Sequence, residues 1–314
     1  MNLETEAENE KLKVKNLILK KRASILALLI SGILLIFKSG AGWWTDSIAV
    51  WASATDSGLD FLTSLINLFA ILVAFKPADE DHRYGHGKAE AIAGLLQSLF
   101  IFLSGSLIFY KAIHSFFEPP KEIQDLPGIL AMVFSLVLTV FLVIYQRYVL
   151  KKTGSLVISA DSLHYSSDIL SNSAVILSLC VVRITGTVQI DFIVGSLIAL
   201  YVIWSSAQIF RSSVDILMDK DVSHFYHSSI VRILLDFQPQ VLGFQKLRTR
   251  SLGELHILEF HLLMPGNLTL HKIKKITDSV EVRLKSEFPS IEVWIHPIPS
   301  NARGRKIKKG NLNS

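Results

Sequence analysis

The sequence predicts a membrane domain of six transmembrane helices, followed by a small cytoplasmic α+β domain of ferredoxin-like type with the element order α-β-β-α-β. Half of the 314 residues are hydrophobic and only 19% are charged, and the mean hydropathy is +0.41. Soluble globular chains are less apolar, so this composition indicates a polytopic membrane protein. After Arg211 the long apolar stretches end and shorter amphipathic segments follow.

Six apolar stretches are long enough to cross a bilayer, which takes about 20 helical residues. The predicted spans are Ala23–Trp44, Ser47–Phe75, Ala91–Tyr110, Leu126–Gln146, Thr153–Val182 and Phe192–Phe210. The third, fourth and sixth contain no charged side chain, whereas the second and fifth contain carboxylates and a histidine. Ionisable groups concentrated in two spans in this way indicate a functional site.

Lysine and arginine residues gather in the N-terminal arm and in the loops after the second and fourth spans. By the positive-inside rule these segments face the cytoplasm, and so do both termini. The start of the chain does not have the pattern of a cleavable signal peptide, so the first span is expected to insert the chain. The predicted organisation is a cytoplasmic arm at 1–22, the membrane domain at 23–211, the α+β domain at 212–299 and a basic, disordered tail at 300–314.

The α+β domain is predicted from helical and alternating periodicity after the last span. Helices are predicted at Val222–Phe237 and Leu270–Phe288, and strands at Leu242–Thr249, Leu255–Met264 and Ile291–His296. Pro289 ends the second helix, and the third strand is expected to stop before Pro297. Three strands and two helices in about 85 residues suit a sheet with helices on one face.

Two pairs of ionisable residues with the same spacing lie at membrane depth. Asp56 and Asp60 are four residues apart in the second span, and His164 and Asp168 are four residues apart in the fifth. Residues four apart share one helix face, and each such group costs about 2.5–3.5 kcal/mol at the centre of a membrane helix. Three carboxylates and one imidazole around a divalent cation compensate this cost, so the spacing predicts a tetrahedral metal site that suits Zn²⁺.

Two other interpretations of these residues remain open, namely buried polar pairs and a proton path without metal. Asp161 lies one turn before His164 on the same stripe, and we interpret it as a group on the access route to the site or just behind its ligands. Asn67 and Asn172 also lie in predicted spans, where hydrogen bonds between helices explain them equally well.

Three motifs carry a resemblance to a known family: DSGLD at 56–60, PADEDHRYGHGKAE at 77–90 and ADSLHYSSD at 160–168. They closely resemble the cation diffusion facilitator family, and above all its bacterial zinc and iron efflux branch. The resemblance covers nearly the whole chain. It implies a homodimer in the inner (plasma) membrane that exports divalent metal from the cytoplasm in exchange for protons.

The resemblance also implies roles for particular residues. The residues that match the family's intramembrane transport site are Asp56, Asp60, His164 and Asp168. A second, loop site matches Asp79, His82 and His86, whose spacing suits three ligands completed by a water. A solvated loop held in place by its histidines is the alternative interpretation of that segment.

In the cytoplasmic domain the match to the family is incomplete. His261 and His296 occupy two ligand positions of the family's dimer-bridging metal site. The positions where histidine, histidine and aspartate are common hold Gln245, Lys274 and Ile298. The sequence therefore predicts at most one weak metal site in this domain, formed by the two histidines.

Charge pairing between protomers is a further implication of the resemblance. Lys88 matches a position that interlocks two protomers in this family, and Asp219 is its expected partner. The alternative is a pair that is solvated or faces phospholipid.

The hypothesis from the sequence is a proton-coupled antiporter for Zn²⁺, with Cd²⁺ and Fe²⁺ as further candidate cargoes. His164 is the expected proton-coupling group, because imidazole titrates near neutral pH. The alternatives are an uptake member of the same family, a member for Mn²⁺ or Co²⁺, and a metal sensor that does not transport. Membrane lipid is an expected partner and nucleic acid is not.

Three classes other than a transporter fit the sequence poorly, namely a sensor, a passive channel and an intramembrane enzyme. A sensor would not need four costly ligands at membrane depth, and strong ligands would trap an ion in a passive channel. An intramembrane enzyme would need a nucleophile or a general base beside the metal, and no span contains HExxH or a serine–histidine dyad. His256, Glu259 and His261 do not have the HExxH spacing and lie in a predicted strand.

Overall fold

The computed structural model describes residues 2–45, 48–115, 126–185, 189–253, 255–288 and 291–300. The chain forms two compact units, one of residues 15–214 and one of residues 215–314 together with residues 1–14. The division lies close to the change of composition at Arg211. Residues 301–314, which make up almost all of the predicted basic tail, lie outside the described residues.

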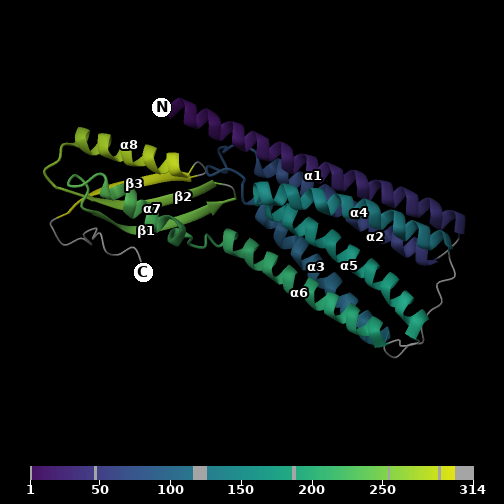
Figure 1. The fold of residues 1–314 in the computed structure, drawn as a ribbon. Coiled ribbons are helices and arrows are strands. Elements are labelled where there is room, and N and C mark those ends of the chain that lie inside the picture. Colours follow the sequence, from purple (N-terminus) through teal and green to yellow (C-terminus); the bar gives the residue numbers. More distant parts are fainter. Residues whose placement is uncertain are drawn as a thin grey trace. The chain divides into compact units, whose positions relative to one another are not determined.

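The first unit consists of long helices (Figure 1). Their bounds are α1 Asn2–Thr45, α2 Ile48–Ala74, α3 Ala89–Ser115, α4 Leu126–Thr153, α5 Leu156–Thr185 and α6 Gln189–Leu217. Within the described part of the chain, five of them contain a stretch that is long and apolar enough to cross a membrane: α1, α2, α3, α4 and α6. The remaining helix, α5, is 30 residues long and carries the polar stripe of the fifth predicted span. The predicted six-helix membrane domain is confirmed.

Helix α5 packs against α2, α3 and α4. This central position explains why it tolerates ionisable residues, because its polar side chains face other helices. One buried cluster joins Ala27 and Leu34 of α1 to Leu142 of α4 and Tyr165 of α5. Helix α1 therefore also contributes to the surroundings of α5.

Helices α3 and α6 approach closely at Gly105. A Cβ atom at this position would lie 3.0 Å from Cγ1 of Ile203 and 3.2 Å from Cγ1 of Val202. We expect Gly105→Ala to lower the stability of the membrane unit by about 1–3 kcal/mol, because overpacking forces neighbouring groups apart. Thermal unfolding in detergent measures this change.

Gly40→Ala is the matched control, since a Cβ atom there would meet nothing within 4 Å. Both substitutions gain the same helix propensity, roughly 1 kcal/mol for alanine over glycine. The difference between the two melting temperatures therefore isolates the steric effect, and equal melting temperatures would contradict the prediction.

The second unit contains α7 Ser223–Leu235, β1 Gly243–Leu252, β2 Leu255–Met264, α8 Leu270–Glu287 and β3 Ile291–Pro299. Strands β1 and β2 are antiparallel, and β2 and β3 are parallel in a sheet of order β1-β2-β3. A parallel pair needs a crossover connection, which α8 supplies (Figure 1). The predicted order α-β-β-α-β is confirmed.

The core of this unit lies between the sheet and the two helices. Leu258, Phe260 and Leu262 of β2 are fully buried there with Leu234 of α7 and Val280 of α8. Successive strand residues point to opposite faces. The odd-numbered residues of β2, which include the predicted metal ligand at 261, therefore lie on the other face of the sheet.

The predicted end of the third strand is wrong. Strand β3 continues through Pro297 and ends at Pro299, with Pro297 opposite Leu262 of β2. Proline has no backbone N–H to donate, but an edge strand needs its donors on one side only. Strand β3 is such an edge strand, because it pairs with β2 alone.

Candidate functional site

Three of the four predicted transport-site residues meet between α2 and α5. The Nε2 atom of His164 lies 2.7 Å from Oδ1 of Asp60 and 3.8 Å from Oδ2 of Asp168. One ligand-type atom from each of the three side chains lies within 4.8 Å of the other two. All three side chains are partly buried. Two carboxylates and one imidazole at this spacing can bind a divalent cation.

Asp56 lies one turn before Asp60 on α2 and is exposed. The structure does not bring it into the group formed by Asp60, His164 and Asp168. Its charge nevertheless acts on the Asp168 carboxylate. The four-ligand tetrahedron therefore stays a prediction, with three of its members in place.

Asp161 lies in a separate cluster of buried amides. Its Oδ1 accepts hydrogen bonds from Asn67 Nδ2 at 3.0 Å and from Gln97 Nε2 at 3.2 Å. Its Oδ2 accepts a hydrogen bond from Gln146 Nε2 at 2.5 Å. The residue is only 1% exposed. These amides join α2, α3 and α4 to α5 and satisfy a carboxylate that would otherwise be costly at this depth.

The amide cluster differs from the role inferred for Asp161 from the sequence. Its hydrogen-bond donors are amides rather than ligands of the transport site, so a role on the access route stays a prediction. Gln97 and Gln146 were missed, although glutamines in otherwise apolar spans are a detectable signal. The side chain of Asn172 lies outside the described residues.

A buried ion pair joins Lys20 of α1 to Glu90 in the first turn of α3. Lys20 Nζ donates to Glu90 Oε1 at 2.6 Å, and Ser155 Oγ donates to Glu90 Oε2 at 2.6 Å. Lys20 is 1% exposed and lies 5.7 Å from the ring centroid of Phe75. The sequence indicated Lys20 only as part of the basic arm, whereas in the structure Glu90 joins α3 both to Lys20 of α1 and to Ser155 at the start of α5.

The predicted loop site is assembled between α2 and α3. Asp79 Oδ1 lies 3.4 Å from His82 Nδ1, and Asp79 Oδ2 lies 3.4 Å from His86 Nε2. The two imidazole rings are 4.5 Å apart. Gly85, with φ of +79°, turns the chain between the histidines. One ligand-type atom from each of the three residues lies within 4.8 Å of the others.

The loop also sets the charge of Asp79. The backbone N–H of His82 donates to Asp79 Oδ1 at 2.7 Å. This hydrogen bond is the main reason that the pKa of Asp79 lies below its usual range, and the nearby His86 and His82 charges add to it. Asp79 therefore stays ionised in mildly acidic solution.

The cytoplasmic pair of histidines lies on neighbouring strands. His261 of β2 is directly opposite His296 of β3, and their rings are 5.6 Å apart. His296 Nε2 also lies 3.2 Å from Glu259 Oε1, a contact that sequence reasoning missed. A metal at this position stays a prediction.

Lys88 and Asp219 belong to different units, so their pairing also stays a prediction. Lys88 immediately precedes α3. Asp219 follows α6, and its Oδ2 lies 3.4 Å from Nε of Arg250 in β1.

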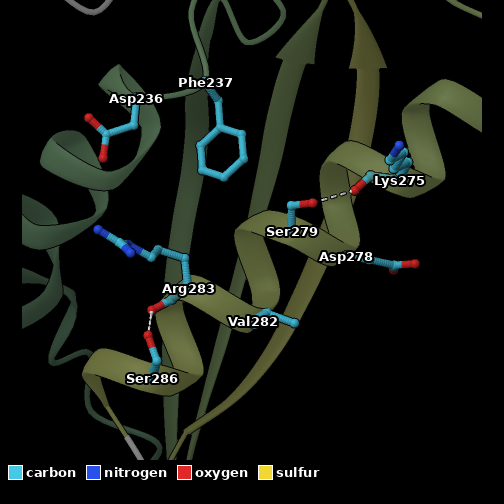
Figure 2. Close-up of a pocket in the computed structure, with 8 residues that line it drawn as sticks. All are labelled: Asp236, Phe237, Lys275, Asp278, Ser279, Val282, Arg283 and Ser286. Carbon is cyan, nitrogen blue, oxygen red and sulfur yellow. Dashed lines mark hydrogen bonds between the residues drawn. The ribbon is translucent and has the colours of Figure 1, made fainter. Parts of the chain in front are cut away.

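A hollow of about 590 Å³ on the cytoplasmic domain contains none of the predicted metal ligands. Its lining residues are Asp236, Phe237, Lys275, Asp278, Ser279, Val282, Arg283 and Ser286 (Figure 2). Both serines donate to backbone carbonyls of α8, Ser279 to Lys275 and Ser286 to Arg283. These hydroxyls already have partners within the helix.

Membrane-spanning helices with carboxylates and an imidazole between them, followed by a small α+β domain, define an integral membrane protein with ionisable groups inside its helical unit. Residues 24–218, more than half of the chain, match the cation efflux transmembrane domain. Residues 222–300 match the cytoplasmic domain of cation efflux proteins. The chain belongs to the cation efflux family, and the resemblance found in the sequence is confirmed.

Individual relatives agree with this assignment. The cation-efflux pump FieF of Cronobacter sakazakii is 36% identical over 90% of this chain and 93% of its own length. The FieF of Salmonella typhi is 34% identical over 94% of this chain and 97% of its own. A solved structure, the metal-bound C-terminal domain of the CzcD transporter from Thermotoga maritima, covers 26% of this chain and 98% of its own at 18% identity. Its TM-score of 0.24 is too low to bear on the fold.

Proposed function

We propose that this protein is a proton-coupled antiporter that exports divalent transition-metal cations from the cytoplasm, with Zn²⁺ as the principal cargo and Cd²⁺ and Fe²⁺ as others. The observation that supports the proposal most is the contact of His164 with Asp60 and Asp168 at membrane depth. Ionisable groups inside a membrane mark ion pathways. The efflux pumps similar to this chain over most of their length agree with the direction of transport.

Coupling follows from the chemistry of the ligands. A cation needs ionised carboxylates and a neutral imidazole, so metal and protons compete for the same atoms. Asp60 and His164 are joined by a hydrogen bond at 2.7 Å. On the cytoplasmic side the metal displaces protons. On the outer, more acidic side His164 takes up a proton and the metal leaves, so exchange needs no separate proton site.

Transport also requires the site to face each side in turn. The helices must rock between two packings, as in other secondary transporters. The loop site of Asp79, His82 and His86 is proposed to gather cations on the cytoplasmic side. We further propose a homodimer in the inner membrane with both termini in the cytoplasm, in which Lys88 and Asp219 interlock the protomers and His261 with His296 binds metal weakly.

The proposal is tested by Zn²⁺ flux into vesicles that contain the purified protein. A pH gradient with the acidic side opposite the Zn²⁺ is expected to accelerate flux, and collapsing the gradient is expected to slow it. A Zn²⁺ flux that does not depend on the pH gradient would indicate a passive channel. Zn²⁺ binding without any flux would favour a sensor.

Metal preference is expected to depend on His164. Replacing it with aspartate leaves only oxygen ligands, which suit harder cations such as Mn²⁺. We expect His164→Asp to lose roughly tenfold or more in the ratio of Zn²⁺ to Mn²⁺ transport, measured by competition in the vesicle assay. His224→Asp in α7 makes the same chemical change outside the membrane unit and is expected to leave the ratio unchanged. An unaltered ratio in His164→Asp would exclude His164 from the ligand set.

A further inference from the structure

Lys38 is a cation within the membrane-spanning part of α1. It lies inside the apolar stretch Val14–Trp44 and is partly buried. A lysine this deep in a span is costly unless a negative charge lies near it. Lys20, also on α1, has such a partner in Glu90 at 2.6 Å, so the question is which carboxylates compensate Lys38.

The packing of α1 on α2 answers this question. A Cβ atom at Gly32 would lie 3.4 Å from the ring of Phe61, and one at Gly58 would lie 3.7 Å from Cδ1 of Leu35. Position 32 of α1 is therefore level with position 61 of α2, and position 35 is level with position 58. Each move of three residues forward along α1 matches a move of three residues back along α2. A further three residues place Lys38 level with the start of the segment that contains Asp56 and Asp60.

The charges around Lys38 agree with this register. Its ammonium group, whose charge burial disfavours most, lies within electrostatic range of three carboxylates that favour that charge: Asp60, Asp168 and Asp56. These are the three carboxylates predicted to bind the transported cation. Without cargo they outnumber the single positive charge that His164 can supply, so the site needs a further cation.

We propose that Lys38 is a tethered counter-cation of the transport site that competes with the divalent cargo for Asp56, Asp60 and Asp168. This inference rests on the proposed function. When the site is empty, the ammonium group offsets the carboxylates. When a divalent cation enters, its charge and that of Lys38 repel each other at low effective dielectric. Lys38 thereby weakens binding enough for the cargo to leave, and it acts as a positioning and affinity-setting residue rather than as a ligand.

The first test compares Lys38→Met with Lys38→Arg in the purified full-length protein. Methionine keeps the apolar length of the side chain and removes the charge, whereas arginine keeps the charge. Titration calorimetry with Zn²⁺ alone is expected to give Lys38→Met a dissociation constant about tenfold lower than that of the unaltered protein. Lys38→Arg is expected to bind like the unaltered protein. Unchanged or weaker binding by Lys38→Met would overturn the proposal.

The second test does not depend on Zn²⁺. In metal-free protein at neutral pH, Lys38→Met is expected to lower the melting temperature, because the carboxylates lose their counter-charge. Combining it with Asp168→Asn should recover part of that loss, a coupling that a double-mutant cycle detects. Additive effects of the two substitutions would overturn the proposal.

The two tests separate this inference from the proposed function. Failure of the proposed function would appear as the absence of proton-driven Zn²⁺ flux in vesicles of the unaltered protein. The melting cycle would still report whether Lys38 and Asp168 interact.

Discussion

Replacing Asp60 or Asp168 with alanine is expected to abolish Zn²⁺ transport while leaving the protein folded and dimeric. Each carboxylate lies beside Nε2 of His164. Each substitution removes one anionic ligand of the divalent cation, and inside the membrane little water is present to replace it. The vesicle flux assay measures transport. Size-exclusion chromatography with light scattering measures the oligomeric state. We expect the flux of both variants to fall to that of empty vesicles.

Asp278→Ala is the matched control. This aspartate is partly exposed on α8 and pairs with Lys274 at 2.7 Å, so its removal makes the same chemical change in the other unit of the chain. Its flux should equal that of the unaltered protein. Normal flux in either Asp60→Ala or Asp168→Ala would remove the basis of the proposed transport site.

Removing Glu90 is expected to have the largest effect on stability. Glu90→Ala leaves Lys20 buried without its 2.6 Å partner, and breaking a buried ion pair from one side costs about 3–5 kcal/mol. It also removes the carboxylate oxygen that accepts the hydrogen bond of the Ser155 hydroxyl. Thermal unfolding of the full chain in detergent should show a markedly lower melting temperature.

The double variant Lys20→Met with Glu90→Met tests whether the loss of stability in Glu90→Ala comes from the lost contact or from the buried lysine charge that remains. Replacing both partners with apolar side chains is often neutral, so the double variant should be more stable than Glu90→Ala alone. Glu281→Ala, which breaks the exposed pair with Lys285 on α8, is expected to cost at most about 0.5 kcal/mol. A melting temperature of Glu90→Ala equal to that of Glu281→Ala would refute the structural role of the buried pair.

Local patterns account for the elements that were predicted correctly. Hydropathy over about 20 residues identifies a span because the thickness of the bilayer sets its length. Alternation identifies β2 because its side chains point to opposite faces of the sheet. The end of β3 could not be found in this way, since Pro297 is excluded from a central strand but not from an edge strand. Which of the two applies depends on strand order.

The candidate sites differ in how much the sequence could predict. Asp79, His82 and His86 lie in one short loop, so spacing alone indicated that they meet. The pairing of Asp60 with His164 spans two helices, and it was inferred from matched spacing and family resemblance. Its geometry, and the exclusion of Asp56 from the contact group, depend on how α2 and α5 are rotated toward each other.

The sequence by itself determined the class of the protein, the positions of its spans, the layout of its cytoplasmic domain and the residue types available to hold a cation. These properties follow from hydropathy and periodicity, which neighbouring residues in the chain fix. Only the tertiary structure decided that Asp161 binds Asn67, Gln97 and Gln146, that Lys20 is buried with Glu90, and that Lys38 is near the transport carboxylates. Such contacts join helices far apart in the chain, so they depend on the depth and rotation at which each helix packs.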